Sequence, residues 1–108
     1  MQSNIQASLQ VTMSDNLRNI AEEQAELHQI LSNSSRLLIL RSLKQQEMSV
    51  GEIAEQIGAT LQNTSQHLRL MKDKGVLEAR RDGQTIYYQI AASQIGENCK
   101  QMLTILDW

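Results

Sequence analysis

The sequence SVGEIAEQIGATLQNTSQHLRLMKDKG, residues 49–75, predicts two helices separated by a very short turn. Ser49 and Glu52 have the spacing of a capping box, in which each side chain satisfies an unpaired amide at a helix start. Gly58 suits the left-handed position that ends such a helix, and Thr60 suits the cap of the next one. Two helices joined by so short a glycine-containing turn are the signature of a helix-turn-helix.

Downstream of this pair the pattern changes from helical to strand-like, over residues 76–81 and 84–90. The dipeptide Asp82-Gly83 between the two runs indicates a hairpin, because a type I′ turn needs a positive φ at both central positions. The second run places three residues on one inward face: Ile86, Tyr88 and Ile90. The sequence therefore predicts a β-hairpin, or wing, after the second helix.

Cap signals also predict three flanking helices. One runs from Ser14-Asp15 to about Ser32, one follows Asn33-Ser34-Ser35, and the last begins near Ser93. We expect residues 1–13 to be a flexible N-terminal tail, either disordered or a frayed extension of the first helix, and residues 14–108 to form one domain. The predicted fold is mainly α with a small β-hairpin, a winged helix-turn-helix in the order α-α-α-α-β-β-α.

The predicted core is thin, which favours a homodimer. A chain of 108 residues buries about two-thirds of its unfolded surface, and this one contains no Phe. The first and last helices nevertheless carry more apolar surface than a monomer of this size needs. The residues expected at a dimer interface are Leu17, Ile20, Leu27, Leu31, Ile95, Met102, Leu103 and Leu106.

Charge and cysteine content limit the classes of protein to consider. The net charge is −2, but residues 1–32 sum to −3 and residues 60–91 to +2, so positive charge gathers around the wing. One cysteine excludes an internal disulfide and a multi-cysteine zinc module. Neither a secretory signal nor a membrane span is recognisable, so we expect a cytoplasmic protein without membrane contact.

The second helix of the pair carries side chains suited to the edges of base pairs. Its apolar side is formed by Leu61, Thr64, Leu68 and Met71. The opposite side carries Gln62, Gln66 and Arg69, with Asn63 and Ser65 at its flanks. Gln and Asn can hydrogen-bond to adenine, and Arg can hydrogen-bond to guanine, in the major groove of double-stranded DNA. Alone, such a polar face is equally well explained as a solvated surface.

Two further features favour the DNA-binding interpretation. The free amides behind the Thr60 cap favour a phosphate. At the hairpin tip, Arg80, Arg81 and Gln84 surround Asp82-Gly83, where they can reach phosphates or the minor groove. The short turn and this basic wing together predict a DNA-binding surface.

Four segments of the chain share their order and spacing with a known family. They are Leu31-Ser-Asn-Ser-Ser-Arg-Leu-Leu-Ile-Leu-Arg, Glu47-Met-Ser-Val-Gly-Glu-Ile-Ala, Thr64-Ser-Gln-His-Leu-Arg-Leu-Met and Arg81-Asp-Gly-Gln-Thr-Ile-Tyr-Tyr. Over roughly residues 27–91 the chain thus resembles the ArsR/SmtB family of bacterial repressors. The resemblance implies a winged-helix homodimer whose N- and C-terminal helices form the interface, and an inducer that releases operator DNA.

The resemblance also assigns residues individually. The recognition-helix positions are Gln62, Asn63, Ser65, Gln66 and His67, and the wing positions are Arg80, Arg81 and Gln84. His67 is interpreted as a packing or phosphate-contacting residue rather than a metal ligand. The family commonly has Val where this chain has Thr64, a difference that we expect to have little effect.

The usual metal sites of the family are missing from the sequence. Many members sense soft metals through two cysteines at the start of the first helix of the pair, because thiolates select such ions. Ser49 and Gly51 occupy these positions here. Others bind zinc through carboxylates and histidines of the last helix, where this chain has Glu97, Cys99 and Asp107 and no histidine. We expect no metal site and no cofactor, and the inducer is unassigned.

Three alternatives accompany this interpretation. Cys99 lies on an apolar seam, which favours a buried structural thiol over one that oxidises or links two subunits. A hydrolytic enzyme has no support, because Ser65 and His67 point in different directions and no carboxylate is placed to orient the histidine. A dimeric interaction module that does not bind DNA is the competing function, since the net charge is negative. Binding to promoter DNA that weakens with salt distinguishes the two.

Overall fold

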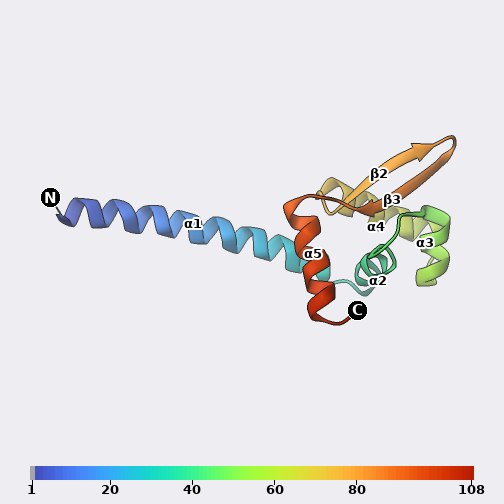
Figure 1. Cartoon of the computed structure of the whole chain (residues 1–108), viewed down its shortest axis with the longest axis horizontal. Coiled ribbons are helices and arrows are strands. Elements are labelled where there is room, and N and C mark those ends of the chain that lie inside the picture. Colours follow the sequence, from blue (N-terminus) through green and yellow to red (C-terminus); the bar gives the residue numbers. More distant parts are fainter. Residues whose placement is uncertain (1) are drawn as a thin grey trace.

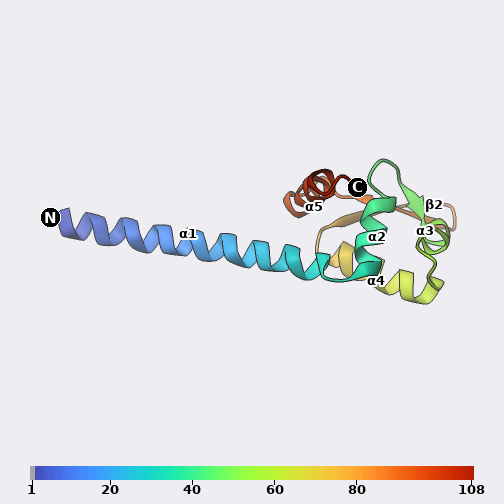
Figure 2. The same cartoon turned by 90° about the horizontal axis from the view of Figure 1, so that it is seen from below.

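The computed structural model has five helices and a small antiparallel sheet among the residues it describes, which confirms the predicted winged helix-turn-helix. It describes residues 2–108, with side chains from Met13 onward. The elements are α1 (Gln2–Leu31), α2 (Ser34–Ser42), β1 (Met48–Ser49), α3 (Val50–Ile57), α4 (Leu61–Asp73), β2 (Leu77–Asp82), β3 (Thr85–Ile90) and α5 (Gln94–Ile105). Figure 1 and Figure 2 show α1 extending away from the other elements, which pack together.

The first helix begins earlier than the sequence predicts. A start at Ser14 is wrong, since α1 runs unbroken from Gln2. Residues 2–13 contain neither Gly nor Pro, so nothing in that segment interrupts a helix. Near its C-terminal end α1 packs on the body through the buried Leu27 and Ile30. The flexibility expected of residues 1–13 stays a prediction. No helix in the described part of the chain combines the length and the apolar character needed to cross a membrane.

The sheet contains a strand that the sequence did not predict. β1 pairs with the middle strand β3, which gives the strand order β1-β3-β2. A two-residue strand is too short to show an alternating pattern, so the sequence carries no signal for it.

The hairpin turn also differs from the prediction. Asp82 pairs with Thr85, so the central residues of the turn are Gly83 and Gln84. Gly83 has a φ of 63°, whereas neither Asp82 nor Gln84 has a positive φ. The predicted type I′ turn centred on Asp82-Gly83 is therefore wrong. A positive φ at the first central residue only, here a glycine, is the pattern of a type II′ turn. Such a turn also matches the twist of the two strands.

One hydrophobic core joins the helices to the sheet. Its fully buried members come from α2, α3, α4, α5 and the residue just before β2, and include Ile39, Leu40, Ile53, Leu68, Met71, Val76 and Leu103. Each such aliphatic side chain contributes about 1.5–3 kcal/mol by leaving water. Leu61, assigned to the apolar side of its helix, is instead 60% exposed. It lies in the first turn of α4, outside the buried stretch that begins at Thr64.

Candidate nucleic-acid interface

Hydrogen bonds fix the start of α3 and both sides of the turn between α3 and α4. The Ser49 side chain accepts the Glu52 N–H at 3.2 Å, and the Glu52 carboxylate accepts the Ser49 N–H at 2.9 Å, which starts α3 as predicted. Gly58 ends α3 with a φ of 68°. Thr60 then caps α4, since its Oγ1 accepts the Asn63 N–H at 3.1 Å. The contacts of Gly58 and Thr60, on the two sides of the turn, set the direction of α4 relative to α3.

Helix α4 is buried on one side and polar on the other. Thr64, Leu68 and Met71 are buried, and the Thr64 hydroxyl donates to the Thr60 carbonyl at 2.8 Å, so no polar atom is left without a partner there. The opposite side exposes Gln62, Asn63, Gln66 and Arg69, with Ser65 half-buried beside them. At 3.6 residues per turn, positions 62, 66 and 69 share one face of the helix. The structure thus brings together the residues predicted to contact bases.

His67 lies half-buried at the edge of this face. Burial is the main cause that lowers its pKa, and the positive charge of Arg36 lowers it further. Arg36 is itself held in place, because its Nε and Nη2 donate to the carbonyls of Ile30 and Gln29 at 2.9 and 3.0 Å. Both effects favour the uncharged imidazole at neutral pH.

The wing presents its two arginines on opposite faces of the sheet. Side chains alternate along a strand, and the register pairs Arg80 with Tyr87 and Arg81 with Ile86. Arg81 therefore shares the face of Leu77 and Ala79, which packs on the helices, but it lies near the tip and is exposed. Gln84 is exposed in the turn itself.

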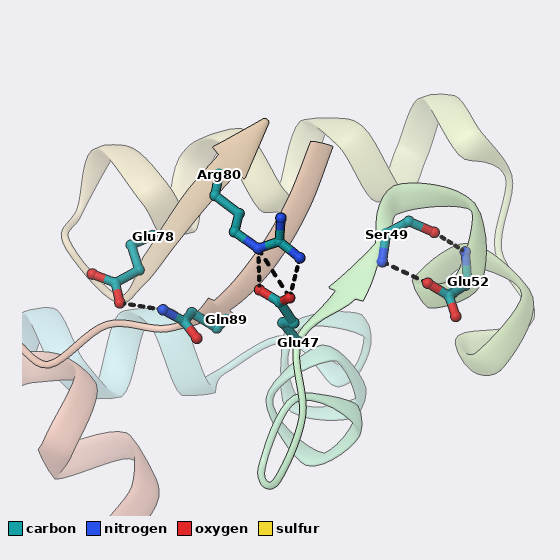
Figure 3. A network of polar contacts seen from close by, with 6 residues as sticks. All are labelled: Glu47, Ser49, Glu52, Glu78, Arg80 and Gln89. Atoms are coloured by element: carbon teal, nitrogen blue, oxygen red, sulfur yellow. Dashed lines mark hydrogen bonds and ion pairs between the residues drawn. The ribbon is translucent and has the colours of Figure 1, made fainter. Parts of the chain in front are cut away.

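Arg80 is engaged within the chain. Its Nε donates to both carboxylate oxygens of Glu47 at 2.9 Å, and its Nη2 donates to Oε1 of the same group, as drawn in Figure 3. The guanidinium also lies 4.6 Å from the centre of the Tyr87 ring. The hydrogen bond from Arg80 is the main cause that lowers the pKa of the Glu47 carboxyl. Sequence reasoning missed Glu47, because it precedes an undetectable strand and lies 33 residues from its partner.

The residues predicted to form a dimer interface divide into two groups. Leu27 and Leu103 are buried in the core of the single chain, and Leu31, Ile95 and Met102 are half-buried. Leu17, Ile20 and Leu106 are exposed, and Met13 and Ile105 extend the exposed apolar surface beside them. The exposed members lie on the projecting part of α1 and at the end of α5 (Figure 1).

Cys99 is buried in the core, on the inner side of α5. Burial raises the pKa of its thiol to about 11, so almost no thiolate forms at neutral pH. The predicted burial of Cys99 is confirmed, and its purely structural role stays a prediction. Among the described residues, no group of three or more His, Cys, Asp or Glu side chains is arranged to hold a metal ion.

Comparison with known proteins gives consistent matches. The family model described as "Bacterial regulatory protein, arsR family" matches residues 33–79. The nodulation protein NolR of Rhizobium meliloti is 39% identical over 75 residues, which are 69% of this chain and 62% of that protein. A curated regulator of Mycobacterium tuberculosis matches over 50% of its own length, so the chain spans half to three-fifths of these two relatives.

Solved structures match over most of their length. The crystal structure of the transcriptional repressor BigR from Xylella fastidiosa has a TM-score of 0.78 at 30% identity, covering 85% of this chain and 91% of that one. The solution structure of a homodimeric winged helix-turn-helix DNA-binding domain from Mycobacterium bovis, described as a possible ArsR-family regulator, has a TM-score of 0.70 at 32% identity. The match covers 83% of both chains.

Proposed function

Because the chain belongs to the ArsR family of bacterial regulatory proteins, we propose that it is a transcriptional repressor that binds an inverted-repeat operator as a homodimer. The observation that carries the proposal is the two-sided character of α4. Its buried side ties it to the core, and its other side exposes amide and guanidinium groups. A rigid helix with such a polar face is suited to the major groove.

Each group at the proposed interface has a distinct role. Gln62 and Gln66 would contact adenine edges, and Arg69 would contact guanine, which gives sequence preference. Asn63, Ser65 and His67 flank this face and would contact the adjoining backbone. The amides that follow the Thr60 cap would hold a phosphate at the N-terminus of α4.

The wing would supply the second anchor. Arg81 and Gln84 are exposed at its tip, and Arg81 lies on the face that packs on the helices, on the same side of the sheet as α4. Contacts of this kind position a protein on the duplex and carry little sequence information.

Exposed apolar residues support the dimer. Leu17, Ile20 and Leu106 are exposed although they are large and apolar, and a second copy would remove them from water. The Mycobacterium bovis neighbour is described as homodimeric. A two-fold dimer would place its two α4 helices about one DNA turn, or a multiple of it, apart, which requires an inverted repeat.

We also propose that neither usual metal switch of the family operates. Ser49 occupies the first of the two positions at which many family members carry a metal-binding cysteine. Its hydroxyl already caps α3 by accepting the Glu52 N–H. At the second, Gly51 has no side chain. The only cysteine of α5 is buried in the core. A signal for release of DNA would therefore act through a different site.

Paired variants test the proposed recognition. Gln66→Ala should reduce binding to the operator while leaving binding to random duplex unchanged, since a base contact is lost. Arg81→Ala should weaken both by a similar factor, because a phosphate contact is the same on every sequence. Anisotropy titrations on a footprinted promoter duplex and on a random duplex of equal length measure both. Equal losses on the two duplexes for Gln66→Ala would contradict the role of α4.

A further inference from the structure

The outer face of the wing holds a cluster that spans all three strands of the sheet. Glu47 directly precedes β1, Tyr87 lies on the middle strand β3, and Arg80 lies on β2. Arg80 and Tyr87 are register partners on neighbouring strands. The Arg80 guanidinium therefore extends over the Tyr87 ring and reaches the Glu47 carboxylate at the opposite edge of the sheet. We call these three residues the wing clamp.

We propose that Arg80 is a positioning residue that fixes the wing to the start of α3, and that Arg81 is the wing arginine that contacts DNA. This inference rests on the proposed DNA-binding function and deepens it. It assigns different roles to Arg80 and Arg81, two adjacent arginines for which the sequence alone predicts the same DNA-contacting role.

The hydrogen-bonding of Arg80 is the first argument. Two of its nitrogens donate to the Glu47 carboxylate, and the bidentate geometry matches the planar fork of the guanidinium. The ring of Tyr87 covers one side of the group. A phosphate could recruit Arg80 only by displacing a carboxylate that is already in place and that would repel it.

The distribution of charge on the two faces is the second argument. The outer face of the hairpin carries Glu78 and Asp82 on either side of Arg80, and Glu47 lies against it. Gln89 donates to Glu78 at 2.6 Å on the same face (Figure 3). The opposite face carries one charged residue, Arg81, among apolar side chains. The outer face is therefore negative overall, and the face of Arg81 is positive, as phosphate binding requires.

The connection to α3 is the third argument. Glu47 lies two residues before Ser49, which caps α3 and is also the register partner of Tyr87 in β1. Figure 3 shows the Arg80–Glu47 contact beside the Ser49–Glu52 capping box. Fixing the position of Glu47 therefore also fixes the position of the first residues of the helix-turn-helix. The wing clamp would keep the wing and α4 at the spacing that lets both contact one duplex.

Salt dependence separates the two roles. The slope of log K against log salt is negative, and its magnitude falls by about 0.9 for each phosphate contact removed. Arg81→Gln should reduce the magnitude of the slope by that amount and weaken binding to the operator and to random duplex alike. Arg80→Gln should leave the slope and random binding unchanged, because a loosened wing can still reach a phosphate on any duplex. It should weaken operator binding about tenfold, the equivalent of one base contact, because base contacts need a fixed spacing between the wing and α4. Glu47→Gln should weaken operator binding as Arg80→Gln does, although the first variant removes a negative charge and the second removes a positive one.

Two results would overturn the proposal. A slope reduced by Arg80→Gln as much as by Arg81→Gln would make Arg80 a phosphate contact. Unchanged operator affinity in both Arg80→Gln and Glu47→Gln would remove the positioning role. Circular dichroism and thermal unfolding of each variant verify the fold, and Glu47→Gln provides the test if Arg80→Gln does not fold.

The wing clamp also has a readout that needs no DNA. In the wild type, NMR titration should find the Glu47 carboxyl with a pKa below its ordinary value, and Arg80→Gln should restore that value. An unshifted carboxyl in the wild type would refute the clamp itself. If the clamp is present and the wild-type protein binds no duplex, the proposed function fails instead.

Discussion

At the scale of single residues, Cys99 gives the clearest chemical prediction. Its thiol is buried and its pKa is about 11, so about one part in a thousand is thiolate at pH 8. A thiol-reactive dye should label the native protein very slowly and the protein in guanidinium chloride rapidly. Mild oxidant should leave DNA affinity unchanged in the wild type and in Cys99→Ser. Rapid labelling of the native state, or release of DNA by oxidant in the wild type only, would show a redox-active thiol.

His67 gives a prediction on pH. Its folded-state pKa is below the usual 6.5, so the unfolded chain binds the proton more readily. Stability from this residue is therefore fully present above about pH 6.5 and is lost as the pH falls through the lower, folded-state pKa. Urea denaturation between pH 8 and pH 5 should show a smaller decline for His67→Gln than for the wild type. An identical decline in both proteins would mean that His67 is not the group responsible.

The structural role of a residue was predictable from the sequence where its interaction is local. Ser49, Gly58 and Thr60 make their contacts within a few neighbouring positions, so type and spacing were enough to assign them. Arg80 shows the opposite case, because its partner Glu47 is brought to it by the order of three strands. Leu61 was misassigned because helical spacing alone does not say at which turn the core ends.

At the scale of elements, the N-terminus of α5 depends on a glycine that sequence reasoning overlooked. A Cβ at Gly96 would overlap the Ala91 carbonyl oxygen, which is part of the backbone and has little freedom to shift. Gly96→Ala should lower the free energy of unfolding by about 3 kcal/mol through this overpacking.

Gly51 in α3 is the matched control for Gly96. A Cβ at Gly51 meets nothing within 4 Å, so Gly51→Ala should instead stabilise the protein by about 0.5 kcal/mol through helix propensity. Urea unfolding of both variants measures the difference. A similar effect of the two substitutions would refute the close approach of α5 to the residues before it.

Most of the elements were predictable from local sequence signals, although α1, the longest, begins earlier than expected. The helices α2 to α5 and the two hairpin strands have periodic apolar residues and caps, and all were anticipated. β1 has two residues and no pattern of its own. The hairpin turn was placed one residue early, because the Asp-Gly pair suits a type I′ turn while the strand register selects Gly83 and Gln84.

At the scale of the whole molecule, the exposed surface of α1 gives a prediction on assembly. Leu17 is 63% exposed, so Leu17→Glu should not disturb the core of the single chain, but it would place a charge in the proposed interface. Sedimentation velocity at micromolar concentration should find the wild type as a dimer and this variant shifted toward monomer. Leu61→Glu, at a residue 60% exposed on α4, should stay dimeric. A monomeric wild type, or equal behaviour of the two variants, would contradict the interface.

Binding of double-stranded DNA by the exposed face of α4 and the wing should be visible in a salt-dependent titration. The wild-type protein is titrated by fluorescence anisotropy against duplexes from the region upstream of its own gene and against random duplex, between about 50 and 200 mM salt. One upstream duplex should bind two chains, more tightly than random sequence, with an affinity that falls steeply as salt rises. Binding that is absent, or independent of salt, would contradict this prediction.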